Sequence, residues 1–495
     1  MITQILIGGK AGQGPNIVTQ LVGEALIEKG FYVFYSRDYQ SLIRGGHNFN
    51  ILTFSDEKVL SNKSKSDILV CLDEETAKIH KKDLEKTAII LNGAHENMFF
   101  AGMLFKLLCL DFSLLENALK KLKNFEDNLK QAKEGYKLET RTCKIILNKE
   151  NKGNFLNGTQ GIAEGAVKSG LDIYYAYPMT PATPLLFELA QKEVKDNKLK
   201  VVELENEISV VIAALGSSAC GKRVMVGTSG GGFDLMTEGL SMADQAEIPL
   251  VIYLASRPGP GTGVATYTSQ GDLNLALGAG HGELFRIVAC PGDPLEAEEL
   301  TNQIFLLSQK YKVPCIILND KHLAESFYTI KEQAKILDIK DKTELKRYNS
   351  YETQEGEIAT EDALIIKKGF DLRLKKQAEV EKFCRTFKQY KIYGKNNSKN
   401  IIVSYGSPKG AILDAIKDLD CKFIQVLYLS PFADIEKEIN GKNIILIENS
   451  STAQLANLIR EKTGIKIEDK NKILRYDGRP FFSDELKEEI KRRLK

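Results

Sequence analysis

Cysteine and histidine are scarce in this chain, and neither occurs in a metal-binding pattern. The eight cysteines lie far apart among 495 residues, without a CxxC or CxH spacing, and only five histidines occur. Iron–sulfur clusters and structural zinc sites need closely spaced ligands, so we expect neither in this chain, and no other metal site. Most cysteines stand inside apolar runs, which favours free, buried thiols in a reducing, cytoplasmic setting.

The sequence also lacks long apolar segments and an excess of charge of either sign. No apolar run approaches the length that crosses a membrane, and Met1–Ile7 leads into a strand pattern without the features of a signal peptide. The formal net charge is only +2, so we expect neither nucleic acid nor membrane as a partner. Apolar content of 43% and charged content of 27% are those of an ordinary globular protein.

Alternating strand and helix patterns divide the sequence into three α/β units. We expect them at residues 1–150, 154–330 and 400–495, a division consistent with the chain length. A charged connector, residues 331–399, joins the last two and contains an amphipathic helix between Phe370 and Tyr390. The prediction is therefore an α/β protein of three domains with mainly parallel sheets, the first domain being of Rossmann type.

A glycine-rich turn after the first strand, Gly8–Pro15, is a weak signal for nucleotide binding. Its glycines at positions 9, 12 and 14 reverse the GxGxxG order, and the acidic residue expected about 20 positions later is poorly placed. Close packing of the helix against the strand explains the turn equally well. Binding of an anion at the helix N-terminus is a further alternative. An NAD-dependent dehydrogenase is therefore disfavoured.

The stretch from Tyr174 to Asp272 has the strongest features of a ligand site. Each short apolar run there meets Gly, Pro, Ser or Thr at its expected carboxyl end, where parallel sheets bind ligands. No nucleophile–base pair or phosphate-binding P-loop accompanies them. The polar groups are the turn Tyr177–Pro181, the acids Glu203, Glu205 and Glu207, the turn Thr228–Phe233 and the loop Arg257–Gly263.

These segments resemble the alpha subunit of the 2-oxoacid:ferredoxin oxidoreductases. Tyr177–Pro181 matches the family motif YPITP with one conservative change, and Glu205–Glu207 matches its acidic strand end. Thr228–Phe233 resembles the TSGPGF turn, although Gly231 replaces the proline. Arg257–Gly263 and Gln270–Leu273 are similar to its RGGPSTG and QxDL elements.

The flanking units extend the resemblance to the gamma–alpha fusion form of the family. Residues 1–55 are similar to the gamma subunit, through Gly9–Gly14 and Arg44–His47. Residues 400–464 resemble the C-terminal domain of transketolase, through Tyr405–Ser407 and Ile447–Asn449.

The resemblance implies a thiamine diphosphate enzyme that decarboxylates a 2-oxoacid oxidatively, reduces ferredoxin and forms an acyl-CoA. The diphosphate-binding GDG…N signature and the cluster cysteines are missing, so a separate beta subunit would supply them, with Mg²⁺ and the [4Fe-4S] clusters. This chain would contribute the pyrimidine-binding side of a shared site and be inactive alone. 2-Oxoglutarate is favoured as substrate. A pyruvate- or branched-chain-specific homologue, and a non-catalytic nucleotide-binding regulatory or scaffold protein, remain the alternatives.

The resemblance also assigns roles to residues. Glu207 would activate the aminopyrimidine of the cofactor, Thr180 would hydrogen-bond the bound 2-oxoacid or the cofactor adduct, and Arg257 would bind the substrate carboxylate. Each residue also has a purely structural interpretation. Glu207 could be an acid at a helix N-terminus, Thr180 an N-cap hydroxyl and Arg257 a surface arginine paired with a neighbouring acid. The gamma-like unit would cover the site and help admit coenzyme A, through Gly12, Gly14, Arg44, Gly45 and Gly46. The cofactor-binding residues would be Tyr177, Pro178, Glu207, Thr228, Ser229, Gly230, Gly231 and Phe233.

Overall fold

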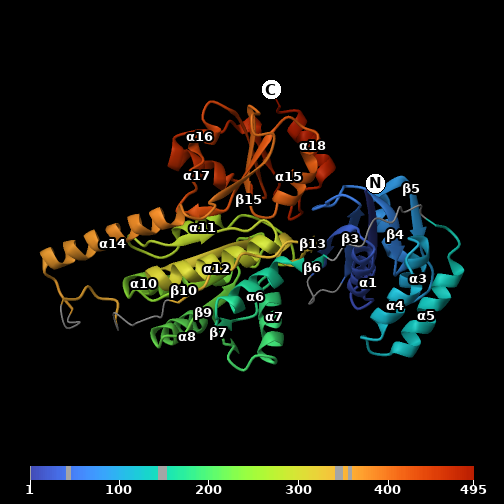
Figure 1. Ribbon diagram of the computed structural model, residues 1–495, viewed down its shortest axis with the longest axis horizontal. Coiled ribbons are helices and arrows are strands. Elements are labelled where there is room, and N and C mark those ends of the chain that lie inside the picture. Colours follow the sequence, from blue (N-terminus) through green and yellow to red (C-terminus); the bar gives the residue numbers. More distant parts are fainter. Residues whose placement is uncertain (1, 41–45, 143–152, 341–348, 355–358, 495) are drawn as a thin grey trace.

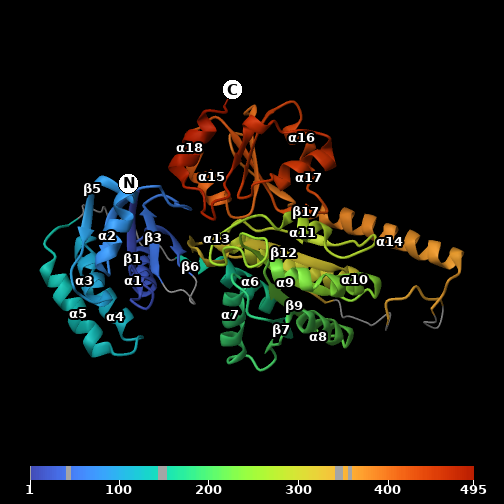
Figure 2. The same cartoon turned by 180° about the vertical axis from the view of Figure 1, so that it is seen from behind.

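The computed structural model describes residues 2–40, 46–142, 153–340, 349–354 and 359–494. Three sheets organise these residues, each with helices beside it (Figure 1, Figure 2). In Figure 1 the N-terminal unit lies beside the central unit, the C-terminal unit sits above them, and helix α14 (Ala363–Cys384) projects outward. The sheets are mixed and, taken together, mostly parallel, so the predicted fold class is confirmed.

The first sheet takes two of its seven strands from the second unit. Its strand order is β5-β4-β1-β3-β2-β13-β6, and its core helices α1, α3, α4 and α5 pack on one face. On the other face Leu6, Leu69 and Cys71 form a small cluster beside the short helix α2. The elements are β1 (Thr3–Lys10), α1 (Pro15–Glu28), β2 (Tyr32–Asp38), β3 (His47–Ser55), β4 (Ser66–Cys71), α2 (Glu74–His80), β5 (Leu84–Leu91), α3 (Asn97–Leu107), α4 (Phe112–Leu119), α5 (Phe125–Leu138), β6 (Asn154–Asn157) and β13 (Phe327–Ile330).

The second sheet is buried on both faces, and its central strand shows why. In β10, Val251 and Tyr253 pack towards α6, α7 and α12, whereas Ile252 and Leu254 pack towards α8 and α10. The order is β17-β11-β12-β10-β9-β7-β8, and all pairs except β11–β17 are parallel. The elements are α6 (Gly158–Lys168), β7 (Ile173–Ala176), α7 (Thr183–Glu193), β8 (Lys200–Glu203), α8 (Glu207–Ala219), β9 (Val224–Thr228), α9 (Gly230–Leu235), α10 (Thr237–Gln245), β10 (Leu250–Ser256), α11 (Leu273–Gly278), β11 (Ile287–Ala289), α12 (Pro294–Tyr311), β12 (Pro314–Asp320), α13 (Lys321–Glu325) and β17 (Tyr428–Ser430).

The third sheet shares one hydrophobic core with the second. Ile401, Val403 and Ile424 of its strands belong to the same cluster as Val226 and Leu254. The sequence predicts one strand from Phe423 to Leu429, but the structure divides it between the third sheet and the second. The elements are β14 (Tyr390–Gly394), β15 (Asn400–Tyr405), α15 (Lys409–Ala415), β16 (Lys422–Val426), α16 (Glu436–Ile439), β18 (Asn443–Glu448), α17 (Gln454–Thr463), β19 (Lys472–Leu474) and α18 (Ser483–Lys491).

Two expectations from composition concern the thiols and the membrane. The seven cysteines that the structure describes are free; Cys109 and Cys220 are exposed, and the others are buried. Within the described ranges, no helix combines the length and apolar character that spanning a membrane requires.

Candidate active site

Glu207 is the buried acid at the carboxyl edge of the second sheet. It begins α8, directly after the N-cap residue Asn206, and its side chain is 2% exposed. Glu203 and Glu205, the other acids of this segment, are exposed. Within the described chain, Glu207 Oε1 has no hydrogen-bond partner. Because a buried carboxylate oxygen is costly to leave unpaired, this geometry indicates a group that a ligand completes.

The glycine turn after β9 lies directly against this carboxylate. A Cβ atom at Gly232 would lie 2.1 Å from Thr228 Oγ1 and 2.4 Å from Glu207 Oε1, so only glycine lets the turn approach so closely. Ser229 is fully buried, and its Oγ has no partner among the described residues. Phe233 is buried in the core and anchors the end of the turn. Glu207, Thr228, Ser229 and the glycines are therefore brought together.

Arg257 follows β10 and contacts the turn that contains Thr180. Its Nη1 donates a hydrogen bond of 2.6 Å to the backbone carbonyl of Thr180, and its Nε, buried, has no partner in the described part of the chain. Burial lowers the pKa of the guanidinium, against the opposing effect of Asp272. Tyr177 and Thr180 are half-buried, and Pro178 is exposed. The structure thus joins Thr180 and Arg257 through the backbone of Thr180.

A cavity of about 540 Å³ opens beside Arg257 and the glycine turn, between the second and third units. Its wall includes Gly230, Gly231, the Arg257–Gly261 loop and Ser450–Thr452 of the third unit. Gly231 faces the loop, since its Cβ position lies 3.6 Å from the carbonyl oxygen of Gly261. The two loops that the sequence singled out therefore line one cavity.

Asp272 is an acid of this wall to which the sequence analysis gave no role. Its carboxylate accepts a 2.7 Å hydrogen bond from Ser256 Oγ and lies where a Cβ on Gly230 would be only 2.8 Å away. Burial raises the pKa of Asp272; the Ser256 hydrogen bond opposes this shift, the charge of Asp234 adds to it, and Arg257 opposes it. The signal that could have found it is its place in the Gln270–Leu273 element.

The third unit fixes the segment that carries Asp272. Gln270 donates from N to the Asn449 carbonyl (2.7 Å) and from Nε2 to the Tyr405 carbonyl (2.8 Å), and its Oε1 accepts from Asn449 N (2.8 Å). The Tyr405 hydroxyl donates back to the Gln270 carbonyl at 3.1 Å. Buried Glu448, next to Asn449, accepts the N–H groups of Gln454 and Leu455 at 3.0 Å. The motifs Tyr405–Ser407 and Ile447–Asn449 therefore act in docking one unit onto the other.

A second cavity, of about 620 Å³, lies where the three units meet. It shares Thr268 and Gly478 with the first cavity. Cations outnumber carboxylates in its wall, which favours an anionic ligand. The charged lining residues are Arg37, Lys65, Lys82, Lys321, Arg475 and Arg479 against Asp38, Asp83 and Glu485.

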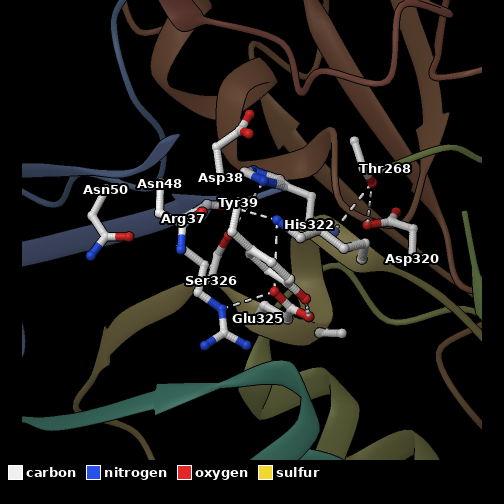
Figure 3. Close-up of polar contacts among 12 residues, drawn as sticks. Arg37, Asp38, Tyr39, Asn48, Asn50, Thr268, Asp320, His322, Glu325 and Ser326 are labelled. Carbon is white, nitrogen blue, oxygen red and sulfur yellow. Dashed lines mark hydrogen bonds and ion pairs between the residues drawn. The ribbon is translucent and has the colours of Figure 1, made fainter. Parts of the chain in front are cut away.

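A buried ionic cluster forms part of this second wall (Figure 3). Glu325 accepts from Arg37 Nε at 2.8 Å and from the Tyr39 hydroxyl at 2.9 Å, and Lys321 Nζ lies 3.6 Å away. Burial acts to raise the pKa of Glu325, but Arg37 and Lys321 outweigh it and hold that pKa below its usual value. The cluster fastens the first unit to the second.

The described glycines of the predicted coenzyme A site, Gly12, Gly14 and Gly46, line neither cavity. Ala11 N donates to the Gly46 carbonyl at 3.0 Å, which joins the Gly9–Gly14 turn to the residue directly before β3. Gly12 and Gly14 both have positive φ, at 94° and 74°, where glycine is favoured. Arg44 and Gly45 lie outside the described residues.

Comparison with known proteins agrees with this architecture. The family model "Pyruvate flavodoxin/ferredoxin oxidoreductase, thiamine diP-bdg" matches residues 164–391, and "Pyruvate ferredoxin/flavodoxin oxidoreductase" matches residues 4–96. The 2-oxoacid:ferredoxin oxidoreductase subunit alpha of Sulfolobus sp. is 29% identical, over 98% of this chain and 96% of the relative. The ketoisovalerate oxidoreductase subunit VorB of Methanothermobacter thermautotrophicus is 28% identical, over 63% of this chain and 90% of the relative.

A solved structure shares the whole fold. It is the 2-oxoglutarate:ferredoxin oxidoreductase from Magnetococcus marinus with 2-oxoglutarate, coenzyme A and succinyl-CoA bound. The TM-score is 0.88 at 23% identity, and the match covers 100% of both chains. At this identity, the likeness concerns the fold alone.

Proposed function

Because the chain belongs to the 2-oxoacid:ferredoxin oxidoreductase family, as an alpha subunit, we propose that it forms one side of an active site for the oxidative decarboxylation of a 2-oxoacid. The products would be CO₂ and an acyl-CoA, and ferredoxin would take up the electrons. The observation that carries the proposal is the buried, unpartnered Glu207 carboxylate against the glycine turn.

The residues present fit the pyrimidine end of thiamine diphosphate. Glu207 Oε1 and Ser229 Oγ are buried polar atoms without partners in the described chain, and Gly232 lets the turn lie directly against Glu207. Glu207 and the backbone of Thr228–Gly231 would hold the ring, with Tyr177 and Pro178 beside it, while Phe233 anchors the turn from the core. When bound, thiamine diphosphate supplies a nucleophilic carbon and accepts the electrons that decarboxylation releases.

The protein side of the reaction follows from these positions. Glu207 would hold a proton at Oε1 and share it with the ring nitrogen of the cofactor, in a site from which water is excluded. Arg257 would bind the substrate carboxylate through Nε and its free edge, while Nη1 stays on the Thr180 carbonyl. The Thr180 hydroxyl would contact the bound acid.

Coenzyme A suits the second cavity. Its phosphates would meet cations of the wall such as Lys65 and Lys82, and its thiol end would enter the first cavity at the shared residues Thr268 and Gly478. The assignment of Gly12, Gly14, Arg44, Gly45 and Gly46 to coenzyme A stays a prediction from the resemblance. The cations support the proposal more directly than these glycines do.

The chain would divide into four parts, and strands near the boundaries pair in the sheet of the neighbouring domain. Residues 1–150 form the gamma-like domain, 154–330 the pyrimidine-binding domain, 331–399 the connector and 400–495 the transketolase C-terminal-like domain. β6, β13 and β17 each pair in a sheet outside their own domain. A beta subunit would bring the diphosphate side, Mg²⁺, the [4Fe-4S] clusters and contact with ferredoxin, in the cytoplasm.

The sequence favours 2-oxoglutarate as the substrate, and pyruvate and branched-chain 2-oxoacids are the alternatives. The names of the relatives include both a 2-oxoglutarate and a ketoisovalerate enzyme. A non-catalytic scaffold has no use for a buried, unpartnered Glu207, so the geometry favours an enzyme.

The test is anaerobic viologen reduction by the chain co-produced with its beta subunit, with a panel of 2-oxoacids and coenzyme A. We expect reduction that needs both chains and falls about 100-fold or more in Glu207→Gln. Glu205→Gln, which neutralises the exposed neighbour, is the matched control and should retain activity. A well-formed complex that carries cofactor and clusters, yet turns over no acid, would contradict the proposal.

A further inference from the structure

Charged side chains are few in the wall of the 540 Å³ cavity. Within the described residues they are Arg257, Asp234 and Asp272; the remaining lining residues are glycines, prolines, Leu275, Gln454, Tyr476 and hydroxyl-bearing side chains. The third unit contributes Ser450, Ser451 and Thr452, which are uncharged. The wall formed by this chain therefore has one cation and two carboxylates.

Arg257 has the capacity for one carboxylate. The side chain is 9% exposed, and its Nη1 is already bonded to the Thr180 carbonyl, which fixes the plane of the guanidinium. The buried Nε–H remains available and, with the adjacent free edge, can donate to a single carboxylate group. A 2-oxoacid bound in this way points its side chain away from the only cation of the described wall.

Asp234 and Asp272 line the same cavity, and Asp234 stands four residues after Gly230, against which Asp272 lies. The charge of Asp234 contributes to the raised pKa of Asp272. Asp234 is exposed on α9 at the cavity rim, whereas Asp272 is held by Ser256 against Gly230. A second carboxylate on the substrate would meet these acids without a second cation from the described wall. Like charges at short range in a partly dehydrated site repel strongly.

We propose that the cavity selects monocarboxylic 2-oxoacids and that Asp234 is a specificity-determining residue, which disfavours a second carboxylate on the substrate. The inference rests on the proposed function and departs from the sequence prediction of 2-oxoglutarate. The uncharged side chain of a monocarboxylic 2-oxoacid would meet hydroxyl groups and Leu275 in the same wall, and neither would repel it.

The first test compares kcat/KM for 2-oxobutyrate and 2-oxoglutarate in the complete heteromer. The wild type is expected to prefer 2-oxobutyrate. Asp234→Asn should raise the kcat/KM ratio of 2-oxoglutarate to 2-oxobutyrate about three- to tenfold, because one like charge is removed. Glu238→Gln neutralises an exposed acid one turn along, outside this cavity wall, and should leave the ratio unchanged.

The second test adds a cation. Ser451→Arg places a guanidinium on the opposite wall and should also move the preference towards 2-oxoglutarate. A wild-type preference for 2-oxoglutarate, or a ratio that Asp234→Asn does not change, overturns the inference. A heteromer that turns over neither acid nor any other 2-oxoacid contradicts the proposed function instead, so the two failures are distinct.

Discussion

Gly232 is the residue on which the approach of the turn to Glu207 depends. We predict that Gly232→Ala lowers kcat about 100-fold, because the new Cβ would overlap Thr228 Oγ1 and Glu207 Oε1 and displace the carboxylate. The measurement is viologen reduction by the heteromer together with its thiamine diphosphate content. Gly216→Ala, in α8 where a Cβ meets nothing within 4 Å, is the control. A Gly232→Ala enzyme as active as the control would refute this steric account.

Glu448 makes stability depend on pH. Burial raises its pKa from 4.5 to about 7, against the hydrogen bonds from Ser450 and from the N–H groups of Leu455 and Gln454. Between these two values the folded chain binds more protons than the unfolded chain, so the free energy of unfolding decreases as pH rises through this window. The full decrease, reached above the folded-state pKa, is about 3 kcal/mol.

Substituting this acid should flatten the profile. We predict that Tm of Glu448→Gln falls less than that of the wild type between about pH 5 and about pH 8. Glu461→Gln, which neutralises an exposed acid on helix α17, should keep the wild-type profile. Parallel profiles for Glu448→Gln and the wild type would show that Glu448 does not titrate in this range.

Among the elements, the run β12–α13–β13 carries the chain from the second sheet into the first. Asp320 ends β12 and caps α13 by accepting from Leu323 N, and β13 begins two residues after Glu325. β13 then pairs with β2 on one side and β6 on the other. The first unit therefore forms a wall of the second cavity and is joined to the central unit by this strand pairing. If the first unit moved away from β13 to open the cavity, the pairing between β13 and β2 would break.

Helix α13 of this run contributes Lys321 and Glu325 to the ionic cluster of Figure 3, and loss of the Glu325 charge should lower the stability of the protein. In Glu325→Gln the cations Arg37 and Lys321 lose their buried counter-charge, so we predict a loss of about 3–5 kcal/mol in stability. Thermal unfolding and limited proteolysis of the first unit would measure it. Glu332→Gln removes an exposed ion pair with Lys58 and should change Tm little. Equal effects of the two substitutions would argue against a docking role for the cluster.

At the scale of the whole molecule, the second cavity exists only because three units meet. If it binds coenzyme A, the double substitution Lys65→Gln with Lys82→Gln should raise KM for coenzyme A about three- to tenfold and leave KM for the 2-oxoacid unchanged. Lys81→Gln, an exposed neighbour outside the lining, is the control. An unchanged KM for coenzyme A would place its phosphates elsewhere.

Local sequence was sufficient for many of the elements. The sequence predicts a strand at Val224–Thr228, and β9 has these bounds. It also predicts a helix of small residues at Ile208–Cys220, which differs from α8 by one residue at each end. Apolar periodicity and the glycines that end each run depend on neighbours a few positions away, so they can be read from the chain directly. The choice of Glu207 came from the resemblance, and it is the buried member of its acidic segment.

Long-range packing was needed for the rest. β6, β13 and β17 have three or four residues each and gain their stability from strands far away in sequence, so no local pattern announces them. The split of Phe423–Leu429 between two sheets has the same cause. The partners of Gln270, the place of Asp272 and the charge balance of both cavities depend on units that are separated in sequence and meet only in the folded chain. Strand pairing, hydrogen bonding and the burial of charged groups all depend on which residues are neighbours in space, and the tertiary structure determines those neighbours.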